Sequence, residues 1–353
     1  MILLNLTTQS FRNLGEAEVA FHPNANILVG RNGQGKTNLL EAIYFLATTK
    51  SFRTPRVGSL FRFSSPSVFV SGVLQRGVEK TLSVGLETGE AKKRVLMING
   101  ERVTLPAYLN AMSVFAYSAS RLEIIRGAPE ERRRFLDRGI ASISAGYLEL
   151  LGRYGRVLKQ RNALLAAGTT SGLDAWDAEF LASAAPVQQA RAAYTATLAA
   201  SFAEIVDAHA YHVRGLELLY RPATATTEGR RDELRARMSL SGPQRDNLEF
   251  VLDGRPAAEV LSGGELKMIV LFLKFAKLAL FRSRTDEEPL FLLDDIDAEL
   301  DLEILQRLLS KLPAQTQVFA TSAKEAFLQA LEAGPHRRLT IENGRVTASR
   351  DFA

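Results

Sequence analysis

The first fifty residues change their pattern of apolar and polar positions several times. Ile2, Leu4 and Leu6 alternate with other residues, and positions 19–21 repeat this period of two, which predicts half-buried β-strands. Residues 27–29 form a short apolar run that ends at a glycine, as buried strands often do. Apolar residues then recur at helical spacing across 39–46. The pattern predicts strand, turn, strand, strand, loop and helix.

Residues 68–103 return to strand character. Val68, Val70 and Val73 alternate, and residues 82–86 repeat the pattern. The dipeptide Asn99-Gly100 is typical of a two-residue hairpin turn. This stretch therefore predicts an antiparallel β excursion.

From about residue 121 to 212 the period becomes helical. One apolar stripe covers 147–165 and a second covers 176–209, with turn formers at Gly168–Gly172 between them. Two long helices should therefore fold back on each other as an antiparallel hairpin, and their stripes are interpreted as core packing rather than a binding groove. Residues 229–237 are interpreted as a polar, basic connection.

The pattern after residue 243 is α/β again. It predicts strands at 289–294 and 317–320 with a helix around 301–312 between them. We therefore predict an α/β head made of residues 1–118 and 243–353. Residues 119–242 would form an inserted helical lobe that contains the hairpin.

Composition narrows the class of protein. The chain has 353 residues, 46% of them hydrophobic, which is ordinary for a globular protein and excludes disorder and collagen. It has no cysteine, so zinc fingers and disulfide scaffolds are excluded. No secretory signal or membrane-spanning run is recognisable, which predicts a cytoplasmic protein.

The net charge of +5 is unevenly distributed along the chain. Residues 50–161 hold 20 basic and 9 acidic side chains, whereas the rest of the chain has an acidic excess. This regional excess indicates either a polyanion partner such as nucleic acid or a solvated basic surface.

A glycine-rich loop follows the apolar run at 27–29 and opens the predicted helix. Its sequence matches G-x-x-x-x-G-K-[ST], in which backbone N–H groups and a helix N-terminus surround phosphate oxygens. Lys36 would reach the β/γ-phosphates of ATP and Thr37 would ligate Mg²⁺; the alternative is a tight turn with a capping threonine. The predicted nucleotide-binding residues are Gly30, Arg31, Asn32, Gly33, Gln34, Gly35, Lys36, Thr37 and Asn38.

Two further elements carry candidate chemistry. The strand at 291–294 ends in Asp294 and Asp295, an arrangement that holds Mg²⁺ through the first carboxylate and positions or deprotonates water with the second. Ser262, Gly263, Gly264 and Glu265 open a helix over 266–281. Ser262 there is either a simple N-cap or part of a second phosphate-binding helix N-terminus supplied to another copy of the chain.

The order of these three elements resembles the head of ABC-type ATPases. Phe11-Arg12-Asn13 and the long middle insertion are similar to the SMC-like branch of DNA repair and chromosome maintenance. The closest resemblance is to the RecF family of bacterial recombination proteins, and it covers nearly the whole chain. The motifs that carry it are Ser51-Phe-Arg53-Thr, Gly127-x-Pro129-x-x-Arg132-Arg133-Arg134-Phe-Leu-Asp137, Ser241-Gly-Pro-Gln-Arg245-Asp246 and Leu292-Leu-Asp294-Asp295-Ile-Asp-Ala-Glu299-Leu300-Asp301.

The resemblance implies an ATP-dependent dimeric clamp on duplex DNA at gaps, with weak DNA-dependent ATPase activity. It also implies that the protein works with RecO and RecR to load RecA recombinase, and that it is associated with the nucleoid. Lys36, Asp294, Asp295 and Ser262 would be the catalytic residues, and Arg12 and Asn13 would join the ATP site.

The chain departs from its relatives' pattern in three places. Tyr117–Leu122 lacks the expected proline and acidic residue, and Gln75 is a candidate Mg²⁺-sensing glutamine by position alone. Thr321-Ser322 stand where transporter-type heads have a switch histidine. The histidines are His22, His209, His212 and His336.

Candidate DNA contacts lie in the basic region. On a helix, Arg132, Arg133 and Arg134 would spread around the circumference, so they cannot all face one ligand. Alternation would place Lys92 and Arg94 on one strand face. Few aromatic residues interleave the basic ones, which favours backbone contacts with duplex DNA over base stacking. The predicted DNA set is Arg53, Arg56, Lys92, Arg94, Arg132 and Arg133.

Two other functions remain open from the sequence. One is the ATPase subunit of a membrane transporter, which the missing histidine and the long insertion disfavour. The other is a nucleotide-binding scaffold with no role on DNA.

Overall fold

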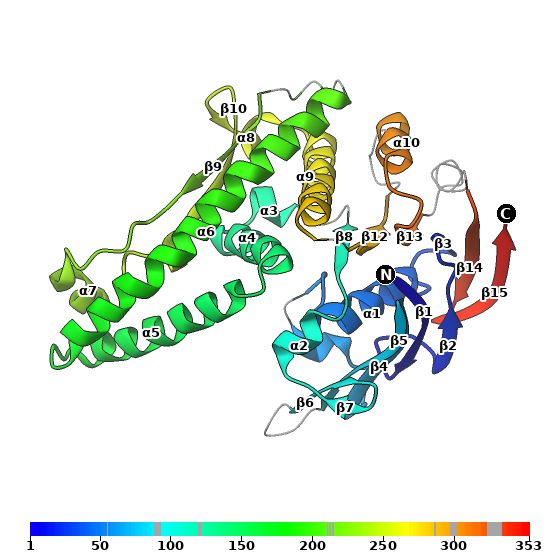
Figure 1. The fold of residues 1–353 in the computed structure, drawn as a ribbon, viewed down its shortest axis with the longest axis horizontal. Helices are drawn as coiled ribbons and strands as arrows, with labels where there is room; N and C mark the ends of the chain where they lie inside the picture. Colours follow the sequence, from blue (N-terminus) through cyan, green and yellow to red (C-terminus); the bar gives the residue numbers. More distant parts are fainter. Residues whose placement is uncertain are drawn as a thin grey trace. The chain divides into compact units, whose positions relative to one another are not determined.

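The computed structural model describes residues 1–54, 56–87, 93–118, 122–209, 211, 213, 215–285, 287–296, 302–322 and 334–353 (Figure 1). Contacts group the chain into two compact units, here called unit 1 and unit 2. Unit 1 comprises Met1–Arg121 with Asp286–Ala353, and unit 2 comprises Leu122–Thr285.

The first sheet of unit 1 is antiparallel, with strand order β2-β1-β4-β5-β6-β7. It confirms the predicted β excursion, because β6 turns into β7 through Asn99 and Gly100, whose φ angles of 52° and 82° suit a two-residue hairpin. The strands are β1 (Ile2–Gln9), β2 (Ala17–Ala20), β4 (Ser67–Arg76), β5 (Val78–Glu87), β6 (Lys93–Ile98) and β7 (Glu101–Arg102).

The alternation predicted for β1 is wrong at its start. Leu3 and Leu6 are fully buried, whereas Ile2 and Leu4 are only partly buried. The register against β4 skips from Leu3 to Asn5, so Leu4 is an extra residue in a β-bulge. Because one inserted residue moves the following side chains to the opposite face, the two halves of the strand cannot follow one period of two.

The second sheet of unit 1 has the order β15-β14-β3-β13-β12-β8. Neighbouring strands from β14 to β8 are parallel, and β15 pairs antiparallel with β14 at the edge. This arrangement confirms the α/β class and the predicted strands near 290 and 318. The strands are β3 (Ala25–Val29), β8 (Val114–Ser118), β12 (Leu290–Asp294), β13 (Val318–Thr321), β14 (His336–Glu342) and β15 (Arg345–Phe352).

Helix α1 (Lys36–Thr48) lies between the two sheets and contacts strands of both. Leu40, Ile43 and Leu46 are fully buried in the core that α1 shares with the sheets. A helix packed on both sides fixes the loop at its N-terminus. The other helical segments of unit 1 are η1 (Val57–Leu60), α2 (Leu105–Leu109) and α10 (Leu302–Ser310).

Unit 2 is built around the predicted helical hairpin. Helices α5 (Tyr147–Ala167) and α6 (Leu173–Ala208) run side by side (Figure 1), and Gly168 ends α5 in the left-handed conformation. The described elements of unit 2 are completed by α3 (Glu123–Arg126), α4 (Pro129–Ile143), α7 (Arg230–Ala236), η2 (Pro243–Arg245), α8 (Ala257–Val260), α9 (Gly263–Arg284), β9 (Glu217–Arg221), β10 (Asn247–Leu252) and β11 (Arg255–Pro256).

The segment at 229–237 contains helix α7 (Arg230–Ala236) rather than the predicted connection. Its Glu233 is buried and accepts a 2.6 Å hydrogen bond from Arg161 of α5, which also bonds Asp177 of α6 at 2.8 Å. A buried guanidinium needs such partners, and supplying one requires ordered backbone at 233. This buried, long-range ion pair, which short-range composition does not reveal, anchors α7 to the helical hairpin.

Residues 243–285 group with unit 2, although we predicted them in the head. Strand β10 pairs with β9, and α9 packs against α6 and α4. Arg191 of α6 bonds Asp246 at 2.8 Å and Pro243 at 2.6 Å. These contacts attach the 241–246 motif and the helix after Ser262 to the helical hairpin. No described helix is long and apolar enough to cross a membrane.

Candidate nucleotide-binding site

The glycine-rich loop lies where the sequence predicts it, between β3 and α1. Gly30, Gly33 and Gly35 have φ angles of 146°, 81° and 113°, which glycine adopts readily. A Cβ on Gly30 would stand 2.4 Å from the Ile341 carbonyl oxygen, so this position also needs glycine for space. The loop therefore has the backbone that a phosphate cradle requires, and it opens directly into the N-terminus of α1.

Lys36 is buried at the first position of α1. Its ammonium donates hydrogen bonds of 2.6 Å to the Gly30 carbonyl and 3.1 Å to the Arg31 carbonyl. These bonds hold a positive charge across the loop, where it can attract phosphate oxygens. Arg31, Asn32 and Gly33 are exposed at the loop's outer edge.

Thr37 lies beside Asp294 at the end of β12. Its hydroxyl donates a 2.8 Å hydrogen bond to Asp294 Oδ1, and Thr321 of β13 donates one of 3.0 Å to the same oxygen. Ser118 of β8 donates a longer bond of 3.3 Å to Oδ2. Three neighbouring parallel strands thus end around one carboxylate, and α1 contributes the fourth group.

Burial, followed by the charge of the neighbouring Asp295, raises the pKa of Asp294 to about 6, although the three hydroxyl hydrogen bonds oppose the shift. A buried carboxylate beside a hydroxyl offers the hard oxygen ligands that Mg²⁺ prefers. The residues present at Thr37 and Asp294 therefore fit a magnesium ion. Bound there, the ion would neutralise phosphate charge.

Asp295 is exposed and has a φ of 50°, an uncommon conformation that Asp and Asn tolerate best. Its backbone N–H donates a 2.9 Å hydrogen bond to the Thr321 hydroxyl. Thr321 therefore holds both acidic residues in place. The local sequence around Thr321 does not reveal this role, because the contact depends on the neighbouring strand β12.

Ser118 reaches Asp294 from β8, whereas Gln75 is exposed on β4, opposite Ile2 and Glu79 in the sheet register. The structure therefore does not support Gln75 as the magnesium-sensing residue. Residues 119–121 lie outside the described part of the chain, as do 297–301 of the motif that begins at Leu292.

The Phe11–Asn13 segment lies against the loop. Asn13 Oδ1 accepts a 2.7 Å hydrogen bond from Asn38 of α1, and it lies 3.1 Å from where a Cβ of Gly35 would be. Arg12 turns instead toward Glu41, with a 2.6 Å bond from its Nε. Both predicted ATP-site residues are thus beside α1, but Arg12 has a buried partner that the sequence analysis missed.

The C-terminal hairpin forms another wall of the loop. The Asn343 N–H donates a 2.7 Å hydrogen bond to the Gln34 side chain, and the Gly344 N–H donates one of 2.8 Å to the Gln34 carbonyl. The sequence analysis missed this contact, although Asn343-Gly344 is the same turn dipeptide that it recognised at Asn99-Gly100.

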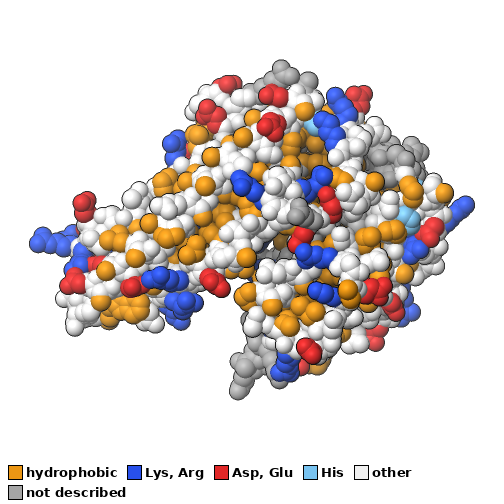
Figure 2. Space-filling view, viewed as in Figure 1, with side chains coloured by type: hydrophobic (Ala, Val, Ile, Leu, Met, Phe, Trp, Pro, Cys, Tyr) orange, Lys and Arg blue, Asp and Glu red, His pale blue; other side chains and the backbone are white. Residues whose placement is uncertain are grey.

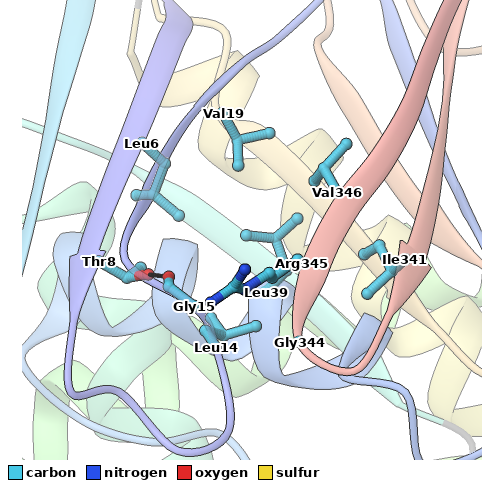
Figure 3. Close-up of a pocket in the computed structure, with 10 residues that line it drawn as sticks. All are labelled: Leu6, Thr8, Leu14, Gly15, Val19, Leu39, Ile341, Gly344, Arg345 and Val346. Carbon is cyan, nitrogen blue, oxygen red and sulfur yellow. Dashed lines mark hydrogen bonds between the residues drawn. The ribbon is translucent and has the colours of Figure 1, made fainter.

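A small pocket separates this hairpin from β1 and β2 (Figure 3). Its volume of about 20 Å³ leaves room for about one water molecule. Thr8 donates a 3.2 Å hydrogen bond to the Gly15 carbonyl at its edge. The pocket is too small for a nucleotide base. It is lined by Leu6, Thr8, Leu14, Gly15, Val19, Leu39, Ile341, Gly344, Arg345 and Val346.

Ser262 belongs to unit 2 and caps helix α9. Its hydroxyl accepts a 3.3 Å hydrogen bond from the Glu265 N–H, and its own N–H donates one of 2.7 Å to the Glu265 carboxylate. This reciprocal pair is a capping box. Ser262 is exposed, and Gly263 and Gly264 occupy the first helical positions. Ser262 is therefore an N-cap of α9, and its role toward phosphate stays a prediction.

Comparisons with known proteins agree with this geometry. The RecF/RecN/SMC N-terminal domain family matches residues 2–344. A DNA replication and repair protein RecF from Geotalea daltonii is 32% identical over 365 residues, covering 98% of this chain and 100% of that protein. The corresponding protein from Lactobacillus acidophilus is 35% identical over 346 residues, covering 91% and 92%.

The chain belongs to the RecF family. A solved structure of the recombination mediator protein RecF with ATP has a TM-score of 0.88 at 24% identity, covering 100% of this chain and 98% of that one. An Smc head bound to a ScpA domain has a TM-score of 0.58 at 16% identity, covering 100% and 98%. These likenesses confirm the ABC-type, SMC-like head fold.

The residues predicted to contact DNA have different surroundings. Arg132 donates hydrogen bonds of 2.9 Å to Asn247 Oδ1 and 2.6 Å to the Gly127 carbonyl, and Arg133 donates one of 2.9 Å to the Asp246 carbonyl. Both are partly buried within unit 2, so their donors already serve the fold. Arg134 pairs with Glu130 and Glu131 of the same helix.

In unit 1, Arg53 donates a 2.7 Å hydrogen bond to Asn38, and Arg53, Arg56 and Arg94 are all exposed. Lys92 lies outside the described residues. Figure 2 shows Lys and Arg side chains scattered among acidic ones over the face drawn, not gathered into one stripe. The charge on that face therefore does not identify a DNA-binding surface.

Three of the four histidines lie among the described residues. His22 accepts a 3.1 Å hydrogen bond from the Asn24 N–H, His209 is buried in unit 2, and His336 begins β14. His212 lies outside the described residues. Thr321, at the position compared with the switch histidine of transporter-type heads, is the last residue of β13.

Proposed function

We propose that this chain is an ATP-dependent DNA-binding clamp of recombinational repair. It is a weak, DNA-dependent ATPase that dimerises on ATP, binds duplex DNA at gaps and helps RecO and RecR to load RecA recombinase in the cytoplasm. The observation that carries the proposal is the hydrogen bond between Thr37 and Asp294 at the phosphate loop of a RecF-family chain.

ATP and Mg²⁺ are the cofactors that these groups suit. Lys36 supplies a point charge to the β/γ-phosphates, while the loop N–H groups supply directed donors. Thr37 and Asp294 would hold the ion, since each offers an oxygen ligand. The solved structures of RecF with bound ATP or an ATP analogue support this assignment.

Hydrolysis would be slow. Asp295 would act as the base that positions water, and its side chain is one methylene shorter than the glutamate common in fast ABC ATPases. A general base must come within about 2.6–3.2 Å of the proton it takes, directly or through one water. The short side chain makes that approach harder.

Two copies are needed to enclose ATP in this proposal. Lys36 belongs to unit 1 and Ser262 to unit 2, and each stands at a helix N-terminus suited to anions. Ser262 and the Gly263-Gly264 backbone of one copy would close over the γ-phosphate held by Lys36 of the other. The dimer would be isologous and would loosen after hydrolysis.

Duplex DNA would be held through its backbone, by Arg53, Arg56, Lys92 and Arg94 in the first place. Arg132 and Arg133 become weaker candidates because their donors are occupied within unit 2. The names of the relatives support a role on DNA, and none of the observations favours a transporter ATPase.

Filter binding with duplex DNA tests the proposal. Affinity should rise with ATP, depend little on sequence and fall with salt, with a slope of log K against log salt of at least about −3 for several phosphate contacts. Lys36→Met should remove the ATP dependence. DNA binding that ignores both ATP and salt would refute the clamp and favour a nucleotide-binding scaffold.

A further inference from the structure

Glu41 is a fully buried carboxylate on α1, in the turn that follows Thr37. A buried carboxylate is costly unless charged or hydrogen-bonding groups surround it. Glu41 plays no part in the phosphate-loop motif or in the acidic pair at the end of β12. Its neighbours therefore show what it does.

Arg12 is the strongest partner of Glu41. Its Nε and Nη2 donate hydrogen bonds of 2.6 and 2.7 Å to the two carboxylate oxygens, which fixes the plane of the guanidinium. Ser51 donates a further hydrogen bond to Oε1, and Arg53 Nη1 lies 3.6 Å from Oε2. One carboxylate thus faces two guanidinium groups, and the cluster keeps a net positive charge.

The turn that carries Arg12 has an uncommon backbone conformation. Ser10 and Arg12 have φ angles of 53° and 52°, on either side of the fully buried Phe11. Residues other than glycine pay for such angles, and they persist where surrounding contacts enforce them. The Arg12 N–H donates a 2.8 Å hydrogen bond to Leu60, which helps to hold the turn.

The same carboxylate organises the segment after α1. Ser51 Oγ accepts hydrogen bonds of 2.9 and 3.0 Å from the N–H groups of Arg53 and Thr54. Arg53 then bonds Asn38, which bonds Asn13 beside Arg12. Hydrogen bonds therefore link Glu41 to both flanking segments next to the phosphate loop.

We propose that Glu41 is a positioning residue for nucleotide binding. It fixes one edge of Arg12 and leaves Nη1 without a hydrogen bond among the described residues, on a side chain that is 19% exposed. That remaining edge is available to a phosphate group of a nucleoside triphosphate. The inference rests on the proposed ATP function, and Glu41 acts through Arg12 rather than touching the ligand.

Equilibrium binding of a fluorescent ATP analogue to the full chain tests this. Glu41→Gln, similar in shape but uncharged, should raise the Kd about tenfold, the lower end of what is lost when groups that orient metal ligands are removed. Arg12→Gln should raise it at least as much. The double variant should be no weaker than Arg12→Gln alone, because Glu41 works through that residue. For Glu41→Gln, the hydrolysis rate at saturating ATP should stay within about twofold of wild type, so that the loss appears in KM.

Gln317→Leu is the matched control. Gln317 is also fully buried in unit 1, where it makes hydrogen bonds of 2.7 and 2.9 Å to the Leu3 backbone. Its loss should lower the melting temperature without changing the Kd. If Glu41→Gln behaves like this control, Glu41 has only a structural role and the inference is overturned.

Ser51→Ala provides a second test of the same network if Glu41→Gln fails to fold. It removes one donor to Glu41, and a several-fold rise in Kd is expected; unchanged affinity would count against the network. Independent, additive effects of Glu41→Gln and Arg12→Gln would also overturn the inference. Wild-type protein that binds no ATP analogue would refute the proposed function itself, which is a separate outcome.

Discussion

The Gly344 N–H donates a 2.8 Å hydrogen bond to the Gln34 carbonyl, so the last hairpin of the chain is attached to the phosphate loop. Asn343 adds a bond to the Gln34 side chain, and Ile341 closes over Gly30. A strand pair more than three hundred residues away thus shapes the loop. The nucleotide site depends on the C-terminal hairpin as well as on its own motif.

Gly344→Ala should therefore weaken ATP binding. Its φ is 75°, and a Cβ would stand 1.9 Å from the Asn13 carbonyl oxygen, so the turn must move away from Asn13 and Gln34. Gly100→Ala is the control, because Gly100 has a similar φ of 82° in the same kind of turn but no atom within 4 Å of its Cβ. Both variants bear the cost of a left-handed alanine, about 1 kcal/mol.

Titration with a fluorescent ATP analogue, alongside thermal unfolding, distinguishes these two glycines. We expect at least a tenfold rise in Kd for Gly344→Ala and wild-type affinity for Gly100→Ala. Equal affinities would show that the hairpin contact does not shape the site.

Ser262→Asp should block dimerisation without unfolding α9. Aspartate caps helices as well as serine does, so the helix should keep its start. The added negative charge would oppose the γ-phosphate of the partner copy. Ser262→Ala reverses the two effects: it loses the cap, about 1 kcal/mol, but adds no charge. Analytical ultracentrifugation with ATP should give a monomer for the first variant and a dimer for the second; two dimers would remove Ser262 from the phosphate site.

Asp295→Asn should retain ATP and lose hydrolysis. Asparagine tolerates the φ of 50° at this position, and the N–H bond to Thr321 is unaffected. Removing a general base typically lowers the rate by about 10²–10⁴. Phosphate release under single-turnover conditions measures this, with nucleotide binding as the control. Turnover at the wild-type rate would mean that another group activates water.

Lys277 of α9 should make the stability of unit 2 depend on pH. It is buried over the Phe135 ring at 4.5 Å, and burial, followed by the charges of Lys274 and Arg138, holds its pKa well below the usual 10.5. The unfolded chain therefore binds the proton more readily, and stability should rise with pH between the lowered pKa and 10.5.

Lys277→Met removes this dependence while keeping an unbranched side chain. Urea unfolding from pH 7 to 9 should show the variant more stable at pH 7. The gap to wild type should narrow as pH rises, by at most about 1.4 kcal/mol per pH unit. Parallel curves would show that Lys277 does not titrate differently in the folded state.

Local pattern was sufficient for most elements and for the phosphate loop. The loop motif, the apolar strand before Asp294 and the turn at Asn99-Gly100 each act over a few residues, so their sequence specifies their structure. The capping box at Ser262 is local in the same way.

Features that depend on distant partners were missed. Helix α7 carries Glu233, whose partner Arg161 lies on α5. The strand order that brings Thr321 to Asp294 is set by tertiary packing. The bulge at Leu4 is a register choice against β4. None of these can be read from spacing along one segment, because each is decided by a second segment far away in the chain.

Sedimentation velocity of Asp295→Asn protein tests the clamp most directly, since slow hydrolysis should preserve the ATP-bound form. We predict a monomer without nucleotide or with ADP, and a dimer with ATP. Mixing Lys36→Met with Ser262→Arg should restore partial hydrolysis, because one composite site then has both an intact loop and an intact cap. Wild-type protein that binds ATP, hydrolyses it normally and remains a monomer at every accessible concentration would contradict the account.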